Sequence, residues 1–316
     1  MKKVVFVEPL GIKKEELKKI IDLYINSENE ITYYENKPKD KEELINRCKN
    51  ADCIVTSQIP IDKEVIDNCS DLKYICVAFT GTDHIDKDYC RQKNIIVSNC
   101  SGYSTSAVAD LVFAMILNIM RNINKCDEAI RNGLDKTGLI GEELEGKTFG
   151  IIGLGDIGTR VAKIADAFGC KVIAYNRHEK NIDFVQNVDL NQLLEESDIV
   201  SLHVPSNVST RHMIGKDELK LMKKSAILIN CARGAVVDNE ALTEALNKKQ
   251  IAGAGVDVFD YEPPLKADYC LLKADNCLLT PHIGFASKQA FVKRAHIVGN
   301  NLKGYINNCF INVVNE

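Results

Sequence analysis

Short hydrophobic runs alternate with amphipathic stretches through the first third of the chain. The hydrophobic runs are rich in β-branched residues, and they cover residues 4–7, 31–34, 53–56, 74–77 and 95–97. Between the first of them lie stretches with helical periodicity, at 13–25 and 41–49. Strands that alternate with helices predict parallel βα units.

The pattern then changes to one long helical segment, expected over residues 105–131, before a second βα series begins. A strand at 148–152, an amphipathic run at 157–168 and a strand at 171–175 form a βαβ unit. Further strands are expected at 199–204, 226–230, 252–257 and 277–279, and a last helix at 288–307. The whole pattern predicts an α/β protein built on parallel sheets.

The length of 316 residues favours two domains over one. The chain shows no internal repeat and no low-complexity linker, so we expect the joints at the helices near residues 100 and 290. Residues 1–100 and 285–316 would then form one domain and residues 101–284 the other. The last helix would return the chain to the first domain.

Composition narrows the classes of function. Hydrophobic residues make up 45% and charged residues 27%, as in ordinary globular proteins, and the net charge of −4 is spread without a basic stripe. Nucleic acid is therefore not an expected partner. The longest apolar run, residues 111–117, is too short to span a membrane, and no export signal is recognised. We expect a cytoplasmic protein without a membrane anchor.

The twelve cysteines are scattered, with no CxxC pair and no Cys/His cluster at zinc spacing. We therefore expect reduced, mostly buried thiols and no metal site. Cys231 lies beside a candidate catalytic residue, but without evidence of a nearby base it is interpreted as a packing residue.

A glycine-rich loop, Gly153-Leu154-Gly155-Asp156-Ile157-Gly158, follows a predicted strand and opens a predicted helix. In this context a G-x-G-x-x-G sequence predicts dinucleotide binding. Gly153 would allow the tight turn, Gly155 the approach of the pyrophosphate, and Gly158 close packing of helix and strand. The helix N-terminus supplies N–H donors and a partial positive charge.

NAD-binding units often carry an acidic residue about 20 positions after the glycines, where it binds the adenosine ribose. Here Asn176 takes that place and is followed by Arg177, His178 and Lys180. Cations that follow a position 176 without a carboxylate favour NADP over NAD, because they would attract a 2′-phosphate where a carboxylate would repel it. A solvated basic turn near Asp183 is the alternative.

Three polar residues follow predicted strands in the second series: Arg233, Glu262 and His282. Carboxyl ends of parallel strands face the ligand crevice. Taken singly, a helix cap, a surface ion pair and a turn histidine would explain them. Their order after a dinucleotide loop favours a shared catalytic role.

With these segments, the chain resembles the D-isomer-specific 2-hydroxyacid dehydrogenase family, which includes glyoxylate/hydroxypyruvate reductases and phosphoglycerate dehydrogenases. The resemblance covers nearly the whole chain. It rests on residues 80–86, 103–110, 153–158, 202–205, 230–234, 257–263 and 280–284. It implies a Rossmann-type cofactor domain inserted into a flavodoxin-like substrate domain, an active site in the cleft between them, and a homodimer.

The reaction of that family can be matched to the three residues. Reduction of a 2-oxo acid needs an anion anchor, a hydride source and a proton. The guanidinium of Arg233 can hold a carboxylate and the neighbouring carbonyl oxygen. His282 can donate or accept the proton, and Glu262 would orient the imidazole and favour its charged form. Formate dehydrogenases of similar sequence carry glutamine where Glu262 stands, so formate oxidation is disfavoured.

The resemblance also implies contacts with the ligands. Substrate contacts fall on Phe79, Thr80, Gly81 and Tyr103, with backbone amides of the 79–81 loop meeting the substrate carboxylate. Cofactor contacts fall on Thr105, Gly153, Gly155, Asp156, Ile157, Gly158, Asn176, Arg177, His203, Pro205, Thr210, Cys231 and Asp257. Asp257 would orient the carboxamide of the nicotinamide.

Two other functions stay open. A phosphoglycerate or phosphite dehydrogenase would need extra cations in the pocket, and Arg91 and Lys93 lie near the 80–86 segment in sequence. A non-catalytic dinucleotide sensor that serves as an interaction scaffold is the second alternative, since fold alone does not exclude it. Turnover of a 2-oxo acid separates an enzyme from a scaffold.

Overall fold

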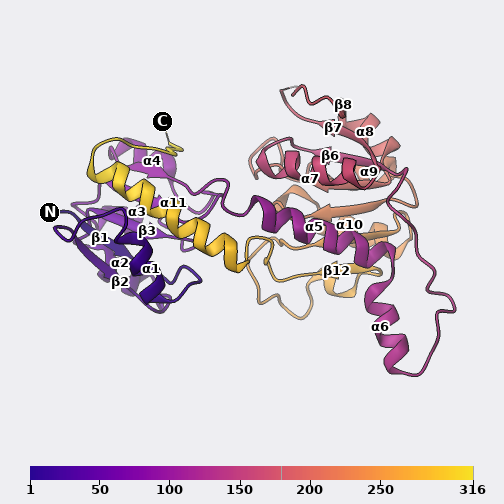
Figure 1. The fold of residues 1–316 in the computed structure, drawn as a ribbon, viewed down its shortest axis with the longest axis horizontal. Coiled ribbons are helices and arrows are strands. Elements are labelled where there is room, and N and C mark those ends of the chain that lie inside the picture. The colour runs from indigo at the N-terminus through magenta and orange to yellow at the C-terminus, as the bar shows by residue number, and fades with distance from the viewer. Residues whose placement is uncertain (179, 316) are drawn as a thin grey trace. The chain divides into compact units, whose positions relative to one another are not determined.

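The computed structural model describes residues 1–178 and 180–315. Contacts divide the chain into two compact units (Figure 1). The first unit consists of Met1–Ser104 and Ala286–Glu316, and the second of Thr105–Phe285. These contacts set the joints at residues 104/105 and 285/286, where the sequence suggested 100/101 and 284/285. The returning segment of the first unit carries the last helix.

A five-stranded parallel sheet lies at the centre of the first unit, in the order β2-β1-β3-β4-β5. This is the flavodoxin-like order. The strands β3 and β4 are buried along their whole length, as expected of parallel strands covered on both faces. The bounds are β1 Lys3–Phe6, β2 Glu30–Tyr33, β3 Cys53–Thr56, β4 Tyr74–Val77 and β5 Ile96–Ser98.

Five helices accompany this sheet, and several begin at an acidic or hydroxyl side chain that caps the first turn. Asp40, Asp62, Asp86 and Ser287 each accept a hydrogen bond from a backbone N–H of their helix. The bounds are α1 Lys14–Ile21, α2 Lys41–Cys48, α3 Lys63–Asp67, α4 Lys87–Gln92 and α11 Lys288–Ile306.

The second unit holds a seven-stranded parallel sheet in the order β12-β11-β10-β9-β6-β7-β8. Strand order reverses between β6 and β9, as in doubly wound dinucleotide-binding sheets. The predicted fold class, α/β with a Rossmann-type sheet and a flavodoxin-like sheet, is thus confirmed. The bounds are β6 Thr148–Ile152, β7 Lys171–Tyr175, β8 Val185–Asn187, β9 Ile199–Leu202, β10 Ile227–Asn230, β11 Gly253–Val256 and β12 Cys277–Leu279.

Hydrophobic clusters cover both faces of the second sheet. One cluster packs α5 and α7 against the sheet, and the other packs α8, α9 and α10. The helices are α5 Thr105–Met120, α6 Ile123–Arg131, α7 Asp156–Ala167, α8 Leu190–Glu196, α9 Lys216–Leu221 and α10 Asn239–Asn247, with short 3-10 turns at Gly234–Val236 and Cys270–Lys273.

The single long helix expected over residues 105–131 is wrong. The structure has two helices, α5 and α6, which meet at an angle of 57°. Asn122 between them takes a left-handed conformation, with φ of 52°, which ends the first helix because continued helical hydrogen bonding needs negative φ. The sequence pattern missed this break because helical periodicity continues across it. It also missed the short strand β8.

Among the described residues, no single helix has the length and apolar composition needed to cross a membrane. The bent pair α5 and α6 meets that criterion only when its two helices are taken together.

Candidate active site

The glycine loop connects β6 to α7 and leaves the first turn of α7 uncapped by any side chain. Gly153 has φ of +100°, and a Cβ there would lie 2.7 Å from the carbonyl oxygen of His203. A Cβ on Gly158 would lie 2.0 Å from the oxygen of Gly153. At Gly155, by contrast, a Cβ would meet no atom within 4 Å. Open space in front of uncapped N–H groups is what a phosphate needs.

Asn176, at the end of β7, is tied to the glycine loop. Its Oδ1 accepts a hydrogen bond from the Leu154 N–H at 3.1 Å, and its amide donates to the carbonyl of His178. The ammonium of Lys180 donates to the Leu154 carbonyl at 2.7 Å, while Arg177 is exposed. Position 176, after β7, holds an amide and not a carboxylate. Of the basic residues that follow it, Lys180 is bound to the backbone of the glycine loop.

His203 follows β9, and its backbone packs against Gly153 of the glycine loop. Its N–H donates to Ile152 O at 2.8 Å, and its Nε2 lies 2.9 Å from Ser201 Oγ. Burial lowers the pKa of His203 to about 3, so the imidazole is neutral at physiological pH. It therefore contributes shape and a neutral hydrogen-bonding group here rather than charge.

The other predicted cofactor residues lie in the second unit with different surroundings. Thr105 begins α5, and the hydroxyl of Thr210 donates to Pro205 O at 2.6 Å within its own loop. Asp156 is exposed in the first turn of α7, whereas Ile157 packs against the core. The Cys231 thiol points at Met115 Sδ, 3.9 Å away, and burial raises its pKa well above the usual range. A protonated, buried thiol agrees with a packing role.

Arg233 follows β10 in a turn that buried polar groups hold. The amide of Asn230, which is fully buried, donates to Arg233 O at 2.9 Å, and its Oδ1 accepts from Ala232 N at 3.1 Å. A Cβ on Gly234 would lie 1.9 Å from the Phe259 carbonyl oxygen, so the backbone after β11 packs directly on the residue after Arg233. The half-buried Arg233 side chain donates to Ala232 O at 2.7 Å.

Glu262 and His282 form a pair. His282 Nδ1 lies 2.7 and 2.9 Å from the two carboxylate oxygens of Glu262. The imidazole is 13% exposed and the carboxylate 62%. Because a carboxylate only accepts, the proton on the imidazole belongs on Nδ1, and Nε2 becomes the nitrogen that can gain or lose a proton. His282 has φ of 55°, so its backbone is left-handed.

The segment that carries His282 is held by Asp257, at the end of β11. The Asp257 carboxylate, 1% exposed, accepts from the Thr280 hydroxyl at 2.5 Å and from the N–H groups of Ile283 and Gly284 at 2.8 Å each. Burial raises its pKa, against these hydrogen bonds. These bonds tie Asp257 to the histidine turn, a role that sequence reasoning did not assign to it.

The three catalytic candidates therefore follow three consecutive strands, β10, β11 and β12, which are neighbours in the sheet and run parallel. Arg233, Glu262 and His282 leave the same edge of the sheet, where Glu262 and His282 are in direct contact. The structure thus groups on one edge a guanidinium and a carboxylate-bound imidazole.

The predicted substrate loop lies in the first unit, after β4. Phe79 and Tyr103 are buried, with ring centroids 6.2 Å apart. Phe79 O accepts from Cys100 N at 2.9 Å, and Thr80 O accepts from the Asn99 amide at 2.8 Å. In a trans peptide the N–H points opposite to the C=O of the same peptide plane. The N–H groups of Thr80 and Gly81 therefore both point away from residues 99 and 100.

Comparisons with known proteins agree with this geometry. A family model described as "D-isomer specific 2-hydroxyacid dehydrogenase, NAD binding domain" matches residues 113–284, more than half of the chain. The chain belongs to the D-isomer specific 2-hydroxyacid dehydrogenase family. As a member of this family with its NAD-binding domain, it is an oxidoreductase that uses a nicotinamide dinucleotide.

Individual relatives cover most of the chain. A glyoxylate reductase of Thermococcus litoralis is 43% identical over 82% of this chain and 82% of its own length. A hydroxypyruvate reductase of Blautia hydrogenotrophica is 34% identical over 90% of this chain and 92% of its own. Among solved structures, an acyclic imino acid reductase, Bsp5, in complex with NADPH and D-Arg superposes with a TM-score of 0.91 at 35% identity, over 99% of both chains.

Proposed function

We propose that the chain reduces small 2-oxo acids of the glyoxylate and hydroxypyruvate type to D-2-hydroxy acids, with a nicotinamide cofactor as hydride source. The observation that carries the proposal is the contact of His282 Nδ1 with both Glu262 oxygens, because it fixes the imidazole with Nε2 as its working nitrogen. Relatives named glyoxylate reductase and hydroxypyruvate reductase support the substrate class.

In this proposal His282 is the general acid and base. Protonated on both nitrogens, the imidazole donates from Nε2 to the oxygen that forms on C2, and it takes the proton back in oxidation. Glu262 holds Nδ1–H and stabilises the charged ring. Asp257 fixes the turn that carries His282, so the imidazole need not be ordered during each turnover.

Arg233 is the proposed anion anchor. Its planar guanidinium can bind a carboxylate and the adjacent carbonyl oxygen together, which a lysine ammonium cannot match in geometry. The fully buried Asn230 side chain binds Arg233 O and Ala232 N, and these two hydrogen bonds fix the backbone that carries the guanidinium. In the first unit, the neighbouring N–H groups of Thr80 and Gly81 form a second candidate anion site, of the nest type.

When bound, the cofactor supplies or accepts the hydride at C2. The open space at Gly155 and the uncapped first turn of α7 fit its pyrophosphate. We infer a preference for NADP, supported by the exposed Arg177 and the absence of a carboxylate at position 176. The engagement of Lys180 by Leu154 O leaves Arg177 as the main candidate for a 2′-phosphate contact.

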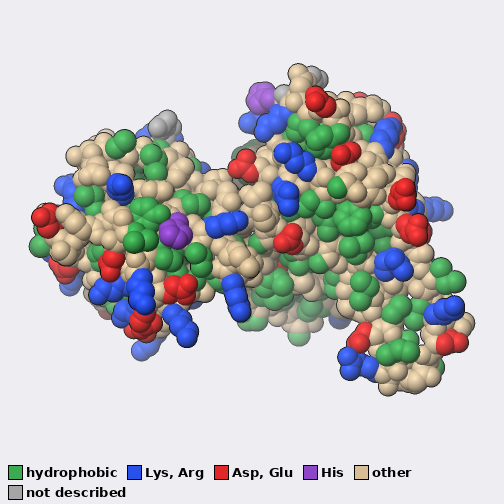
Figure 2. All heavy atoms as spheres, viewed as in Figure 1, with side chains coloured by type: hydrophobic (Ala, Val, Ile, Leu, Met, Phe, Trp, Pro, Cys, Tyr) green, Lys and Arg blue, Asp and Glu red, His purple; other side chains and the backbone are tan. Residues whose placement is uncertain are grey.

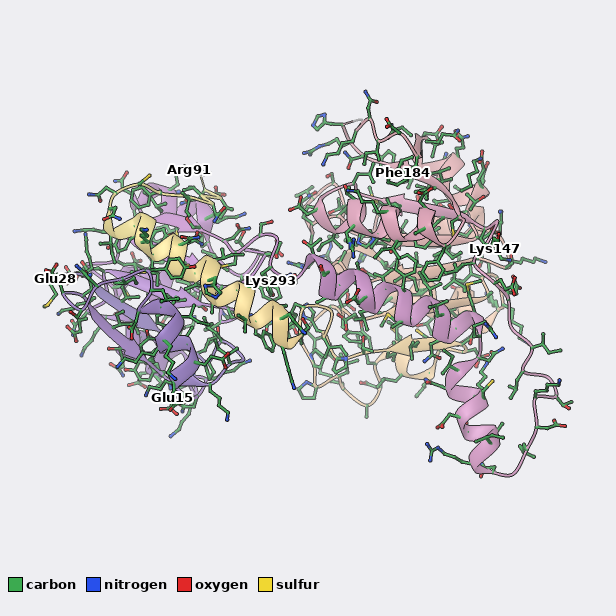
Figure 3. All side chains as sticks on the ribbon, viewed as in Figure 1. Glu15, Glu28, Arg91, Lys147, Phe184 and Lys293 are labelled. Carbon is green, nitrogen blue, oxygen red and sulfur yellow. The ribbon has the colours of Figure 1, made fainter. Side chains whose placement is uncertain are left out.

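The two cations considered for a phosphoglycerate dehydrogenase have partners within the first unit. Arg91, labelled beside α4 in Figure 3, pairs with Asp88 at 2.7 Å and donates to Asn315 O at 3.2 Å. Lys93 pairs with Asp67 at 3.0 Å. We therefore do not assign either cation to a phosphate, and keep the unphosphorylated acids as the proposed substrates.

The test is a substrate panel with both cofactors. Purified protein is mixed with NADPH or NADH and with glyoxylate, hydroxypyruvate, pyruvate, a branched 2-oxo acid or 3-phosphohydroxypyruvate, and loss of absorbance is followed. We expect the highest kcat/KM with glyoxylate or hydroxypyruvate and NADPH. A flat trace with every acid would favour the scaffold, and a clear preference for the phosphorylated acid would favour phosphoglycerate chemistry. Replacing Arg177 with Ala should reduce NADPH affinity more than NADH affinity.

We also propose that the chain forms a homodimer through the region of α6. None of the α6 residues is buried, and Ile130, Leu134 and Ile140 are 71%, 63% and 86% exposed. Figure 2 shows hydrophobic side chains at the surface of α6 and the segment after it, among charged side chains. Such exposed apolar side chains in one region are typical of an interface. Sedimentation should give a dimer, and the pair Ile130→Asp and Ile140→Asp should give a monomer.

All twelve cysteines are free thiols in the structure, and we place the protein in the cytoplasm, where thiols stay reduced.

A further inference from the structure

Arg294, on α11, is a buried cation that neither the sequence motifs nor the proposed chemistry uses. It is 2% exposed and lies on the buried face of the helix, between Ala290 and Val298 at spacings of four residues. A buried guanidinium is costly unless its donors are satisfied. What those donors bind therefore indicates why the cation is there.

The guanidinium donates hydrogen bonds to the backbone directly after β4 and to neighbouring groups. Nη1 donates to Ala78 O and to Ser57 Oγ, at 3.3 Å each, and Nη2 donates to Leu10 O at 2.5 Å. Ser57 Oγ in turn lies 3.4 Å from Ala78 O. Ala78 directly precedes the loop of Phe79, Thr80 and Gly81. Arg294 and Ser57 thus fix the first peptide of that loop.

The loop is held from two sides. Strand β4 lies between β3 and β5 in the sheet, so Ser57, after β3, and Asn99 and Cys100, after β5, flank its end. Asn99 and Cys100 hold the carbonyls of Thr80 and Phe79, while Arg294 holds that of Ala78 on the β3 side. With the carbonyls fixed in this way, the N–H groups of Thr80 and Gly81 face away from residues 99 and 100. Within the described chain, neither donates a hydrogen bond to another group.

Two buried polar atoms near Arg294 have no hydrogen-bond partner among the described residues. They are Nε of Arg294 itself and Oη of Tyr103, which is 2% exposed. The guanidinium carbon lies 5.5 Å from the centre of the Tyr103 ring. Arg294 donates its hydrogen bonds to neutral groups, and the buried carboxylate of Glu8, which accepts from the Ser57 N–H at 2.8 Å, also acts on its charge. In a region of low dielectric, such a charge acts on neighbouring peptide dipoles more strongly than it would in water.

We propose that Arg294 is a positioning residue for substrate binding, which orients the Ala78–Gly81 backbone so that the Thr80 and Gly81 N–H groups bind the carboxylate of the 2-oxo acid. The inference rests on the proposed function, because it gives this loop a substrate.

The test compares Arg294→Met with Arg47→Met as its matched control. Arg47 is also a buried arginine of the first unit, at 7% exposure, and also donates to backbone carbonyls, those of Val7 and Asn36 at 2.7 Å each. It does not contact residues 78–81. Both variants remove a buried guanidinium from the same unit, so a general loss of stability affects both.

We expect Arg294→Met to raise the KM for glyoxylate about tenfold or more, while the KM for the cofactor stays within about twofold. Arg294→Lys, which keeps the charge but not the fork, should fall between wild type and Met. Arg47→Met should leave the glyoxylate KM unchanged. Equal effects of the two Met variants, or an unchanged glyoxylate KM in Arg294→Met, would overturn the proposal. If Arg294→Met does not fold, Arg294→Lys and Ser57→Ala give the same comparison.

A second measurement separates this inference from the proposed function. If wild-type protein turns over no 2-oxo acid, the proposed reaction fails, and calorimetric binding of oxamate in the presence of cofactor then tests the loop alone. Weaker oxamate binding in Arg294→Met than in Arg47→Met supports the positioning role. Equal binding in both variants, or no oxamate binding to wild type, rejects it.

Discussion

Each of the two parallel sheets reverses its strand order at one point, between β1 and β3 in the first unit and between β6 and β9 in the second. Ligands of open α/β sheets bind at such points, beyond the carboxyl ends of the strands. In the first unit, the chain fills that point itself. Glu8, 2% exposed, follows β1, and its Oε1 accepts from the Thr56 hydroxyl and from the N–H groups of Ser57, Gln58 and Ile59, at 2.8 to 3.2 Å.

In the second unit, the corresponding point is left open. Gly153 follows β6, and the backbone of His203 packs beside it. Gly155 leaves the space before the first turn of α7 empty of protein atoms, since a Cβ at this position would have no neighbour within 4 Å. A carboxylate of the chain thus occupies the reversal point of the first sheet, while glycines follow β6 at the reversal point of the second. At the reversal point the two sheets therefore differ in a few side chains, although both are doubly wound parallel sheets.

The largest expected effect tests whether the proton transfer depends on a histidine of the second unit and not on one of the first. His282→Gln should lower kcat at least about 100-fold, because glutamine cannot act as the general acid. Cofactor affinity should not change. The matched control is His296→Gln in the first unit, where His296 Nδ1 lies 2.9 Å from Tyr24 Oη. Stopped-flow and steady-state measurements give the kcat of both variants. Near-normal kcat in His282→Gln would remove this residue from the mechanism.

The next effect tests whether Glu8 acts as the built-in anion of the first unit. Glu8→Ala leaves several buried donors without an acceptor and should cost about 2 kcal/mol of folding stability. Glu8→Gln keeps an acceptor oxygen and should cost less. Formate, a carboxylate small enough for the vacated space, should raise the Tm of Glu8→Ala but not that of wild type. A Tm of Glu8→Ala equal to that of wild type would contradict the role given to Glu8.

The sequence predicted the second unit's site better than the first unit's. Gly153, Gly155 and Gly158 have a spacing that local backbone geometry requires, and His282 and Arg233 follow strands that periodicity identifies. Glu8, Ser57 and Arg294 come from β1, β3 and α11, and only tertiary packing brings them together. One signal was present, since Arg294 lies on the apolar face of its helix, four residues from Ala290 and from Val298. The role of Asp257 was missed for the same reason.

A smaller effect tests the open space at Gly155 directly. Gly155 has φ of −70°, which alanine adopts without strain, and the added methyl group meets no protein atom. Gly155→Ala should therefore keep or slightly raise the Tm while it weakens cofactor binding about tenfold or more, a loss of roughly 1.4 kcal/mol. Gly158→Ala, whose methyl group would meet Gly153 O, should lose both Tm and binding. Unchanged cofactor affinity in Gly155→Ala would place the pyrophosphate elsewhere.

The smallest effect concerns the charge of His203, beside the glycine loop. This imidazole is neutral, in contrast to the Glu8 carboxylate at the reversal point of the first sheet. The pKa of His203 is lowered to about 3 by burial, below the ordinary value of 6.5. Between these values the unfolded chain takes up a proton that the folded chain refuses, so stability is complete above pH 6.5 and falls as the pH drops toward 3. Urea titrations should show a loss of roughly 1 kcal/mol from about pH 6.5 to about pH 5.5 through this residue. His203→Gln should remove that part of the slope, whereas His178→Gln, an exposed histidine near the same loop, should keep it. If the free energy of unfolding changes with pH equally in wild type and in His203→Gln, the imidazole is charged in the folded protein at these pH values.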